Sequence, residues 1–457
     1  MRAVLDRFLT GLARLALRGF FRDLEVVGRE HVPRDRPLLI VANHFNALLD
    51  PVLVMHALGL LPRFVAKASL WRPVWARPLL WLAGMVPVHR PQEGNPTASN
   101  HATFASCHEH LARGRAVALF PEGGLSRVPM LRPVRTGAAR IALGARNAGA
   151  EDLTILPVGL LYEDKVALRS RALVRIGVPI DVDRHLRELG DEGADADDQD
   201  AVRRLTDRIE QRLRELAPAY RDEREAGVLG LAADIALRDP DRLPPRPASL
   251  ARREELARRL ADAPQPARRS VHDAVAHYQL GLSLLGLRDA YLVAPYRLGR
   301  LAGLLLTTAL KLLVLAPFAA VGAAVNALPY WGVHWAGRLV KDPALRASAR
   351  LLAGVALFPP TWLIVAWLAP WNTWWARSLI IVLAPILGLV AVRALEQMIE
   401  VHRTWRGWIA LIERRGELDQ LRADRARLLE LVEATAGRRQ PPTHAEPTGA
   451  EGPAHGP

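Results

Sequence analysis

A histidine and a carboxylate stand six residues apart in the segment VANHFNALLDPV, residues 41–52. A helix through both residues would separate the side chains of His44 and Asp50 by about 9 Å along its axis. Because Asp followed by Pro51 is typical of a helix start, we expect the helix to begin at Pro51 with Asp50 as its N-cap. Residues 44–49 would then form a loop that returns the Asp50 carboxylate to one imidazole nitrogen. His44 would be oriented as a general base; the alternative is a surface histidine beside an ordinary cap.

Three later segments carry polar groups that could act together with this pair. Glu122 ends an apolar run in ALFPEGG, where the adjacent glycines let a polar substrate approach the backbone closely. Arg90 follows a short apolar run in GMVPVHRP. Arg135 precedes the helix that we expect to begin at Thr136-Gly137, and a helix N-terminus with an adjacent arginine favours a phosphate.

The pattern around these residues predicts an α/β layered domain. Short apolar runs alternate with helical stretches between residues 24 and 182, as in domains that place helices against a sheet. The expected strands are 37–43, 63–70, 116–122, 153–162 and 172–180, and the expected helices are 51–61, 95–114 and 136–149.

Composition limits the classes of partner. The chain has 457 residues, so we expect about two or three folded units. Its net charge of +14 admits nucleic acid, an anionic membrane or phosphorylated substrates. Half of the residues are hydrophobic, and the basic residues are spread along the chain, so we expect no nucleic-acid partner. Cys107 is the only cysteine, which excludes a disulfide framework within the chain and a cysteine-based zinc site.

The C-terminal half contains long apolar runs that predict membrane segments over 301–400. We expect 351–369 and 377–397 to form a helical hairpin with its tip outside, because arginine and lysine gather in 329–350 and after 392. Lys311 and Pro317 within 301–328 favour a re-entrant or interfacial segment over a simple span. The alternative is a set of two or three buried core helices.

The remaining segments carry no recognisable chemistry. Residues 1–22 predict an amphipathic helix, either an ordinary packed helix or one lying on a membrane surface. Arginines interrupt its apolar pattern, so we expect no signal peptide. We assign 23–185 to the domain that carries the polar motifs and 186–300 to a charged helical region. A basic helix is expected over 401–435 and a disordered tail over 436–457.

Taken in order, these motifs resemble those of the glycerolipid acyltransferases, the glycerol-3-phosphate and lysophosphatidate acyltransferase superfamily. The resemblance covers about residues 20–182. Five residues separate the histidine from the aspartate instead of the common four, which resembles the branch that includes the dual glycerol-3-phosphate/dihydroxyacetone-phosphate enzymes. GLSRVP, which follows the third motif, departs from the polar run of the family. The matching residues are Asn43, His44 and Asp50; Gly84 to Arg90; Phe120, Pro121, Glu122 and Gly123; and the apolar strand around Pro157.

The resemblance implies a fold, an activity and a site. The fold is a mixed sheet flanked by helices, followed by a helical region and a C-terminal membrane segment. The activity is O-acyl transfer from acyl-CoA or acyl-carrier protein to a hydroxyl of glycerol 3-phosphate or dihydroxyacetone phosphate, on the cytoplasmic face of a membrane. The alternative acceptor is lysophosphatidate, which would give phosphatidate. No metal or other cofactor is implied.

Within that site, the resemblance implies His44 and Asp50 as the catalytic pair. The implied substrate-binding residues are Glu122 and Gly123 for the glycerol hydroxyls, Arg90 and Arg135 for the phosphate, and Lys67 and Asn43 beside them. Two other classes of function stay open. A hydrolase could use the same pair, although no Gly-x-Ser-x-Gly elbow is present. A non-catalytic membrane scaffold would leave the pair and Glu122 without a reason to converge.

Overall fold

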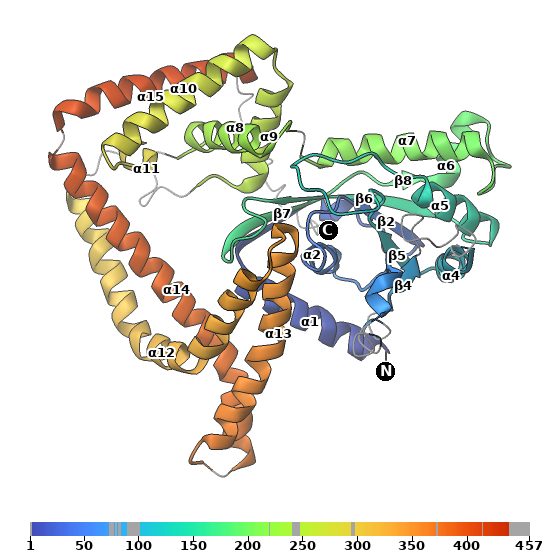
Figure 1. Cartoon of the computed structure of the whole chain (residues 1–457), viewed down its shortest axis with the longest axis horizontal. Helices are drawn as coiled ribbons and strands as arrows, with labels where there is room; N and C mark the ends of the chain where they lie inside the picture. The colour runs from blue at the N-terminus through green and yellow to red at the C-terminus, as the bar shows by residue number, and fades with distance from the viewer. Residues whose placement is uncertain are drawn as a thin grey trace, which may run out of the picture.

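The structure is a computed structural model of the whole chain, shown in Figure 1. It describes residues 2–72, 77, 80, 84–88, 101–218, 220–239, 247–293, 298–371, 373–413 and 415–437. An α/β unit lies on one side of the view, a helical unit lies on the other, and three long helices extend below them.

The α/β unit is built on an eight-stranded sheet. The sheet is mixed, as the resemblance implies, and it has more strands than the five expected. The strand order is β1-β7-β6-β2-β5-β3-β4, with β8 paired to β6. Neighbouring strands run parallel except that β6 is antiparallel to β7 and to β8. The strands are β1 (Phe21–Val27), β2 (Leu38–Ala42), β3 (Arg63–Lys67), β4 (Val86–Val88), β5 (Ala116–Leu119), β6 (Thr154–Tyr162), β7 (Ser170–Ile176) and β8 (Ile180–Asp181).

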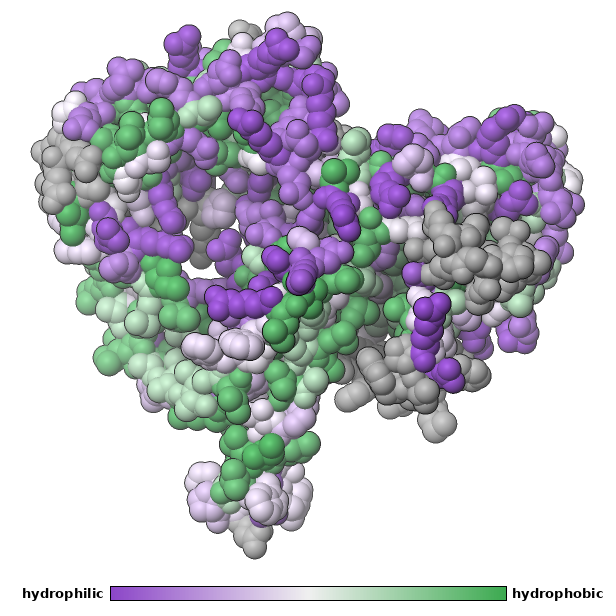
Figure 2. Space-filling view, viewed as in Figure 1, coloured by the Kyte–Doolittle hydropathy of each residue, from purple (hydrophilic) through white to green (hydrophobic). Residues whose placement is uncertain are grey.

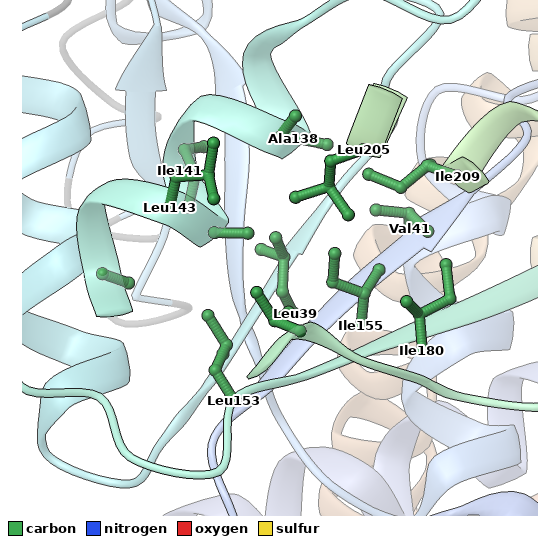
Figure 3. Packing of buried hydrophobic residues seen from close by; sticks show 14 of the residues in the cluster. Leu39, Val41, Ala138, Ile141, Leu143, Leu153, Ile155, Ile180, Leu205 and Ile209 are labelled. Carbon is green, nitrogen blue, oxygen red and sulfur yellow. The ribbon is translucent and has the colours of Figure 1, made fainter. Parts of the chain in front are cut away.

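Helices cover both faces of this sheet. Strand β2 is therefore buried on both sides, which explains why every residue in it is apolar. Leu39 and Val41 enter one core cluster, whereas Ile40 and Ala42 enter the other, because successive side chains of a strand point to opposite faces. Figure 3 shows the first cluster. The elements around the sheet are α1 (Arg2–Phe20), η1 (Arg29–His31), α2 (Leu49–Leu58), η2 (Ala68–Trp71), α4 (His101–Ala112), α5 (Gly137–Asn147), α6 (Val182–Leu189) and α7 (Gln199–Leu216).

The boundary expected at residue 185 falls too early. Helix α7 presents an apolar stripe to the sheet, and Leu205, Ile209 and Leu213 are each 0% exposed in the first core cluster. The spacing of these residues is that of an amphipathic helix, which must bury its apolar side. Charged side chains on its other face gave this segment the character of a separate region. Residues 199–216 therefore belong to the α/β unit.

The helical unit is completed by a helix from the C-terminal end of the described chain. It comprises α8 (Glu223–Ala236), α9 (Leu250–Asp262), α10 (Gln265–Leu284), α11 (Asp289–Val293) and α15 (Leu418–Ala436), which share one apolar cluster. The single basic helix expected over 401–435 is wrong. Helix α14 continues to Glu413, a short 3-10 turn follows at Arg415–Glu417 (η5), and α15 begins at Leu418. Gly416 lies in that turn, where a glycine weakens helix continuation.

Three helices are long and apolar enough to cross a membrane, judged by length and composition. They are α12 (Leu298–Leu339), α13 (Pro343–Leu368) and α14 (Trp374–Glu413), with candidate spans Leu305–Leu339, Leu345–Leu368 and Trp374–Ile409. Figure 2 shows hydrophobic residues gathered over these helices, whereas hydrophilic residues dominate the helical unit above them. Many large apolar side chains are exposed here, which identifies a surface for lipid or protein.

The segment expected to end at residue 328 continues as one helix to Leu339. Pro317 and Pro329 lie inside α12, and its ribbon bends so that both ends lie away from the tip of the α13–α14 hairpin (Figure 1). At the crossing with the other two helices, the Asn326 amide donates to the Ala384 carbonyl at 3.1 Å and accepts from the Trp362 indole at 2.9 Å. Whether α12 re-enters or spans a membrane stays a prediction.

The N-terminal helix α1 packs on the α/β unit through its C-terminal half. Ala13, Leu17 and Phe20 are at most 8% exposed, and Leu17 and Phe20 belong to the same core cluster as α2. This half is an ordinary packed helix. A membrane-surface role for 1–22 stays a prediction.

Candidate active site

Several of the functional residues predicted from sequence meet at the carboxyl ends of the central strands. β2 is parallel to β5 on one side and to β6 on the other, so the carboxyl ends of these three strands lie together. His44 follows β2, Glu122 follows β5, and Tyr162 ends β6. Crevices at the carboxyl ends of parallel strands are where open α/β sheets bind ligands.

The expected contact between His44 and Asp50 is present. His44 Nδ1 lies 2.8 Å from Asp50 Oδ2. The same oxygen accepts the backbone N–H groups of Phe45 at 2.6 Å and Asn46 at 2.8 Å. Tyr162 donates its hydroxyl to the other oxygen, Oδ1. Because Nδ1 is engaged with this fully buried carboxylate, Nε2 is the nitrogen left to meet a substrate.

The prediction that Asp50 caps the following helix is wrong. Helix α2 begins at Leu49 with Leu48 as N-cap, so Asp50 already lies in the first turn. Its carboxylate points back to the N–H groups of the preceding loop instead of to those of the helix. A carboxylate near a helix start can accept N–H groups on either side, and here the loop supplies them together with the imidazole. The loop geometry is therefore fixed by Asp50 itself.

The His44 ring and backbone are also held from the β5 side. The ring stacks on Phe120, with the ring centroids 3.9 Å apart and the planes 8° apart. The His44 N–H donates to Glu122 Oε1 at 2.8 Å, and its carbonyl accepts from the Ser126 N–H at 2.7 Å. Only 13% of the His44 side chain is exposed. These contacts pre-orient the imidazole before any substrate binds.

Glu122 connects the two loops that form the site. Its second oxygen, Oε2, accepts the Arg132 N–H at 3.0 Å, while Oε1 holds His44 as above. Glu122 is 2% exposed. Burial raises the pKa of its carboxyl to about 7, although the two backbone N–H groups and the Arg132 charge act in the opposite direction. The nearby Asp50 carboxylate also raises this pKa.

This raised pKa predicts a pH-dependent stability. Between the ordinary carboxyl value of 4.5 and about 7, folded Glu122 binds more proton than the unfolded chain does. The free energy of unfolding should therefore fall as pH rises through this window. Glu122→Gln does not titrate, so the wild type should lose up to about 3 kcal/mol relative to the variant between pH 4.5 and 8.

Chemical unfolding in detergent at several pH values measures this difference. Glu109→Gln removes a carboxyl that is 62% exposed and serves as the control. The free energy of unfolding of this variant should differ from that of the wild type by a nearly constant amount at all pH values. A difference between wild type and Glu122→Gln that does not change with pH would contradict the prediction.

Arg135 lies against Gly123. Its N–H donates to the Pro121 carbonyl at 2.9 Å. A Cβ placed on Gly123 would lie 2.7 Å from Arg135 Nε, and Gly123 has a φ of +69°, which glycine adopts readily. The glycine therefore permits both the turn and the close approach of the Arg135 guanidinium to the backbone of Gly123.

Three other predicted residues have different outcomes. Asn43 is fully buried, and its amide donates to the Leu160 carbonyl at 2.9 Å and accepts the Leu160 N–H at 2.7 Å. These two bonds tie the end of β2 to β6 and occupy the amide. Lys67 ends β3 and is half-buried at the same edge of the sheet. Arg90 lies outside the described residues.

Sequence reasoning missed two residues that help to build the site. Tyr162 fixes the second oxygen of Asp50, and Arg132 supplies a backbone N–H to Glu122 and a guanidinium beside Gly124. Tyr162 is the last residue of the apolar run ILPVGLLY, so its position at a strand end was a possible signal. The sequence offered no comparable indication for Arg132, because only the folding of the loop between Glu122 and Arg132 brings its N–H to the Glu122 carboxylate.

Comparisons with known proteins find similarity to acyltransferases. Residues 23–161 match the model of the acyltransferase family. The chain is 40% identical over 91 residues to glycerol-3-phosphate O-acyltransferase 2 of Saccharomyces cerevisiae, which is 20% of this chain and 12% of that protein. It is 26% identical over 145 residues to a 1-acyl-sn-glycerol-3-phosphate acyltransferase of Borreliella burgdorferi, which is 32% of this chain and 54% of that protein.

One solved structure is similar in part. The 1-acyl-sn-glycerophosphate acyltransferase PlsC from Thermotoga maritima covers 45% of this chain and 78% of its own, with 19% identity and a TM-score of 0.32. A score at this level supports no inference about the present chain. The chain spans only 12% of the yeast relative and 54% of the relative from Borreliella burgdorferi.

Proposed function

We propose that this chain, whose residues 23–161 match the acyltransferase family model, is a membrane-bound O-acyltransferase that acylates a hydroxyl of a phosphorylated glycerol. The observation that carries the proposal is the His44–Asp50 hydrogen bond within the matched segment, at the edge of the sheet where Glu122 and Arg135 also lie. A non-catalytic scaffold has no need to bury a carboxylate that holds one imidazole nitrogen.

The proposed step is direct transfer. Nε2 of His44 takes the proton from the acceptor hydroxyl as the oxygen attacks the thioester carbonyl carbon. The carbon–sulfur bond then breaks, and the thiolate leaves and takes up the proton from the imidazolium. Asp50 holds the ring in the required tautomer and stabilises the imidazolium that forms. The step needs no covalent enzyme intermediate, metal or other cofactor; acyl-CoA or acyl-carrier protein is the co-substrate.

Two arginine side chains near His44 could bind the phosphate of the acceptor. Arg135 lies over Gly123, and Arg132 lies beside Gly124, so two guanidinium groups flank the loop that carries Glu122. We assign them to the acceptor phosphate, because guanidinium forks match phosphate oxygens. Lys67 and Arg90 remain further candidates for the same group. Glu122 is assigned first to positioning, since both of its oxygens accept backbone N–H groups; its remaining lone pairs would meet a glycerol hydroxyl.

Gly123→Ala is expected to raise the KM for the acceptor about tenfold. The methyl group would displace the Arg135 guanidinium, and the positive φ would add strain of about 1 kcal/mol. Initial rates at varied acceptor concentration measure this. Gly114→Ala is the matched control, because Gly114 has a similar φ of +70° but a Cβ there would meet no atom within 4 Å. An unchanged acceptor KM in Gly123→Ala would argue against Arg135 as a phosphate ligand.

Glycerol 3-phosphate is the first candidate acceptor, with dihydroxyacetone phosphate as its close analogue. The five-residue spacing between His44 and Asp50 and the higher identity to the yeast relative favour it. Lysophosphatidate is the second candidate, because the relative from Borreliella burgdorferi carries that activity in its name. All three acceptors offer a hydroxyl and a phosphate.

The purified 457-residue chain in lipid nanodiscs tests the proposal. Radiolabelled acyl-CoA or acyl-carrier protein is mixed with each acceptor in turn, and lipid products are separated by chromatography. We expect labelled product from at least one acceptor at a rate well above that of His44→Ala. Release of free fatty acid without transfer would indicate a hydrolase, and the absence of both products would favour the scaffold.

The apolar helices indicate membrane association. We further propose that the α/β unit lies on the cytoplasmic face, because Arg338, Lys341 and Arg346 lie at the end of the hairpin that adjoins this unit. A cysteine placed at Thr373 in the hairpin tip should then react with an impermeant maleimide in intact cells. A cysteine at Glu109 on α4 should react only after permeabilisation, and the reverse pattern would place the unit outside.

A further inference from the structure

The loop that carries His44 is held in part by a helix of the membrane segment. The Leu48 N–H donates to the hydroxyl oxygen of Ser348 at 3.2 Å. Ser348 lies on α13 and is 5% exposed. Leu48 is the N-cap residue of α2, two positions before Asp50. A hydroxyl from the membrane hairpin therefore satisfies a backbone donor of the active-site loop.

The beginning of α13 is part of the core under this loop. Ala347 is 0% exposed and belongs to the same apolar cluster as Leu49 and Leu53 of α2, and Leu351 packs against that cluster. Helix α13 contacts both α1 and α2. The hydrogen bond of Ser348 is thus formed inside a packed interface, where its geometry is fixed by neighbouring side chains.

Polar contacts fix the same turn of α13 from its other sides. The Arg350 guanidinium donates to the Val166 carbonyl, close to the end of β6. Arg346 Nε donates to the Val340 carbonyl at 2.9 Å, which ties the start of α13 to the end of α12. Arg127 and Asp342 approach to 3.6 Å, an exposed pair of small energetic weight. The α13–α14 hairpin therefore packs against the α/β unit at the active-site loop.

The contact between α13 and the active-site loop affects the geometry of the His44–Asp50 pair. Between His44 and Asp50, the N–H groups of Phe45 and Asn46 are accepted by Asp50, and that of Leu48 is accepted by Ser348. A shift of Leu48 would move the start of α2 and with it the Asp50 carboxylate. A small misplacement of a catalytic group lowers the reaction rate substantially, even when the substitution that causes it lies far from the reacting atoms.

We propose that Ser348 is a positioning residue for the His44–Asp50 loop, so that the α13–α14 hairpin supports the active site in addition to contacting the membrane. The catalytic consequence rests on the proposed acyl transfer. The structural part, that Ser348 orders residues 44–50, does not depend on any activity.

Kinetics of the full chain in nanodiscs test the catalytic part. Ser348→Ala should lower kcat about 3- to 10-fold, as expected for one lost hydrogen bond, with KM for donor and acceptor nearly unchanged. Ser348→Thr keeps the hydroxyl oxygen and should recover most of the rate. Thr361→Ala is the matched control, because this exposed hydroxyl on the same helix bonds only to the Leu357 carbonyl in its own helix.

Hydrogen exchange of the backbone amides tests the structural part without any turnover. Ser348→Ala should speed exchange in the peptide that contains residues 44–50, whereas Thr361→Ala should not. Should the alanine variant fail to fold, Ser348→Cys gives a similar volume with a weak acceptor, and an intermediate exchange rate is expected.

Two results would overturn the proposal. The first is wild-type exchange over residues 44–50 in both Ser348→Ala and Ser348→Cys. The second is a kcat that falls equally in Ser348→Ala and Thr361→Ala. If the wild type transfers no acyl group to any acceptor, the proposed function fails, and the exchange measurement still decides whether Ser348 orders the loop.

Discussion

His44→Ala is expected to lower kcat for acyl transfer by about 10²- to 10⁴-fold, the usual contribution of a general base. The KM values should change little, because the imidazole acts on the proton of the acceptor and not on its phosphate. The folded protein should persist, since the ring makes one hydrogen bond and one stacked contact, and the backbone contacts of His44 stay in the variant. Transfer rates and thermal unfolding in nanodiscs measure the two effects separately.

The chain offers a matched control for this substitution. His277 also pairs with a carboxylate, that of Asp424 at 3.5 Å, but it lies in the helical unit and its side chain is 70% exposed. His277→Ala should therefore leave kcat at the wild-type value. An enzyme that keeps its normal rate without His44 would remove the mechanism proposed here.

Asp50→Ala is expected to abolish activity and also to destabilise the fold by about 3–5 kcal/mol. The substitution removes the acceptor of four donors at once: the imidazole, the Tyr162 hydroxyl and the N–H groups of Phe45 and Asn46. Each buried donor left without a partner costs about 1–3 kcal/mol, and relaxation of the loop recovers part of that sum. Thermal or chemical unfolding in detergent measures the loss.

Asp164 provides the comparison for Asp50. Its carboxylate also accepts two backbone N–H groups, those of Val166 and Ala167, but on an exposed loop. Water can replace it there, so Asp164→Ala should cost no more than about 1 kcal/mol. Equal destabilisation by the two substitutions would show that the buried network around Asp50 adds nothing to stability.

The effects of the substitutions at His44 and Asp50 should thus differ in what they remove. His44→Ala should separate activity from stability, whereas Asp50→Ala should remove both. This contrast follows from burial and from the number of partners: Asp50 is fully buried with four donors, whereas the His44 side chain is 13% exposed and its ring makes one hydrogen bond. A hydrolase would show the same pattern of stability, so the identity of the product remains the readout that decides between the activities.

The sequence by itself predicted the local parts of this protein. Apolar runs and turn residues located the central strands and the helices between them, because each element is specified by neighbours in the chain. The order of the motifs placed His44 and Glu122 just after strands, and parallel strands bring such ends together. The length of the apolar runs likewise predicted the helices α13 and α14, although α12 is one longer helix.

Only the tertiary structure decided which groups satisfy one another. Asp50 accepts from the loop before it instead of capping α2, and Tyr162 lies 112 residues away from the carboxylate that it holds. Helix α7 joins the α/β unit because its apolar stripe finds the sheet, and Ser348 reaches Leu48 across 300 residues. A hydrogen bond between distant segments leaves no periodic pattern in the sequence, so the spatial arrangement alone determines it.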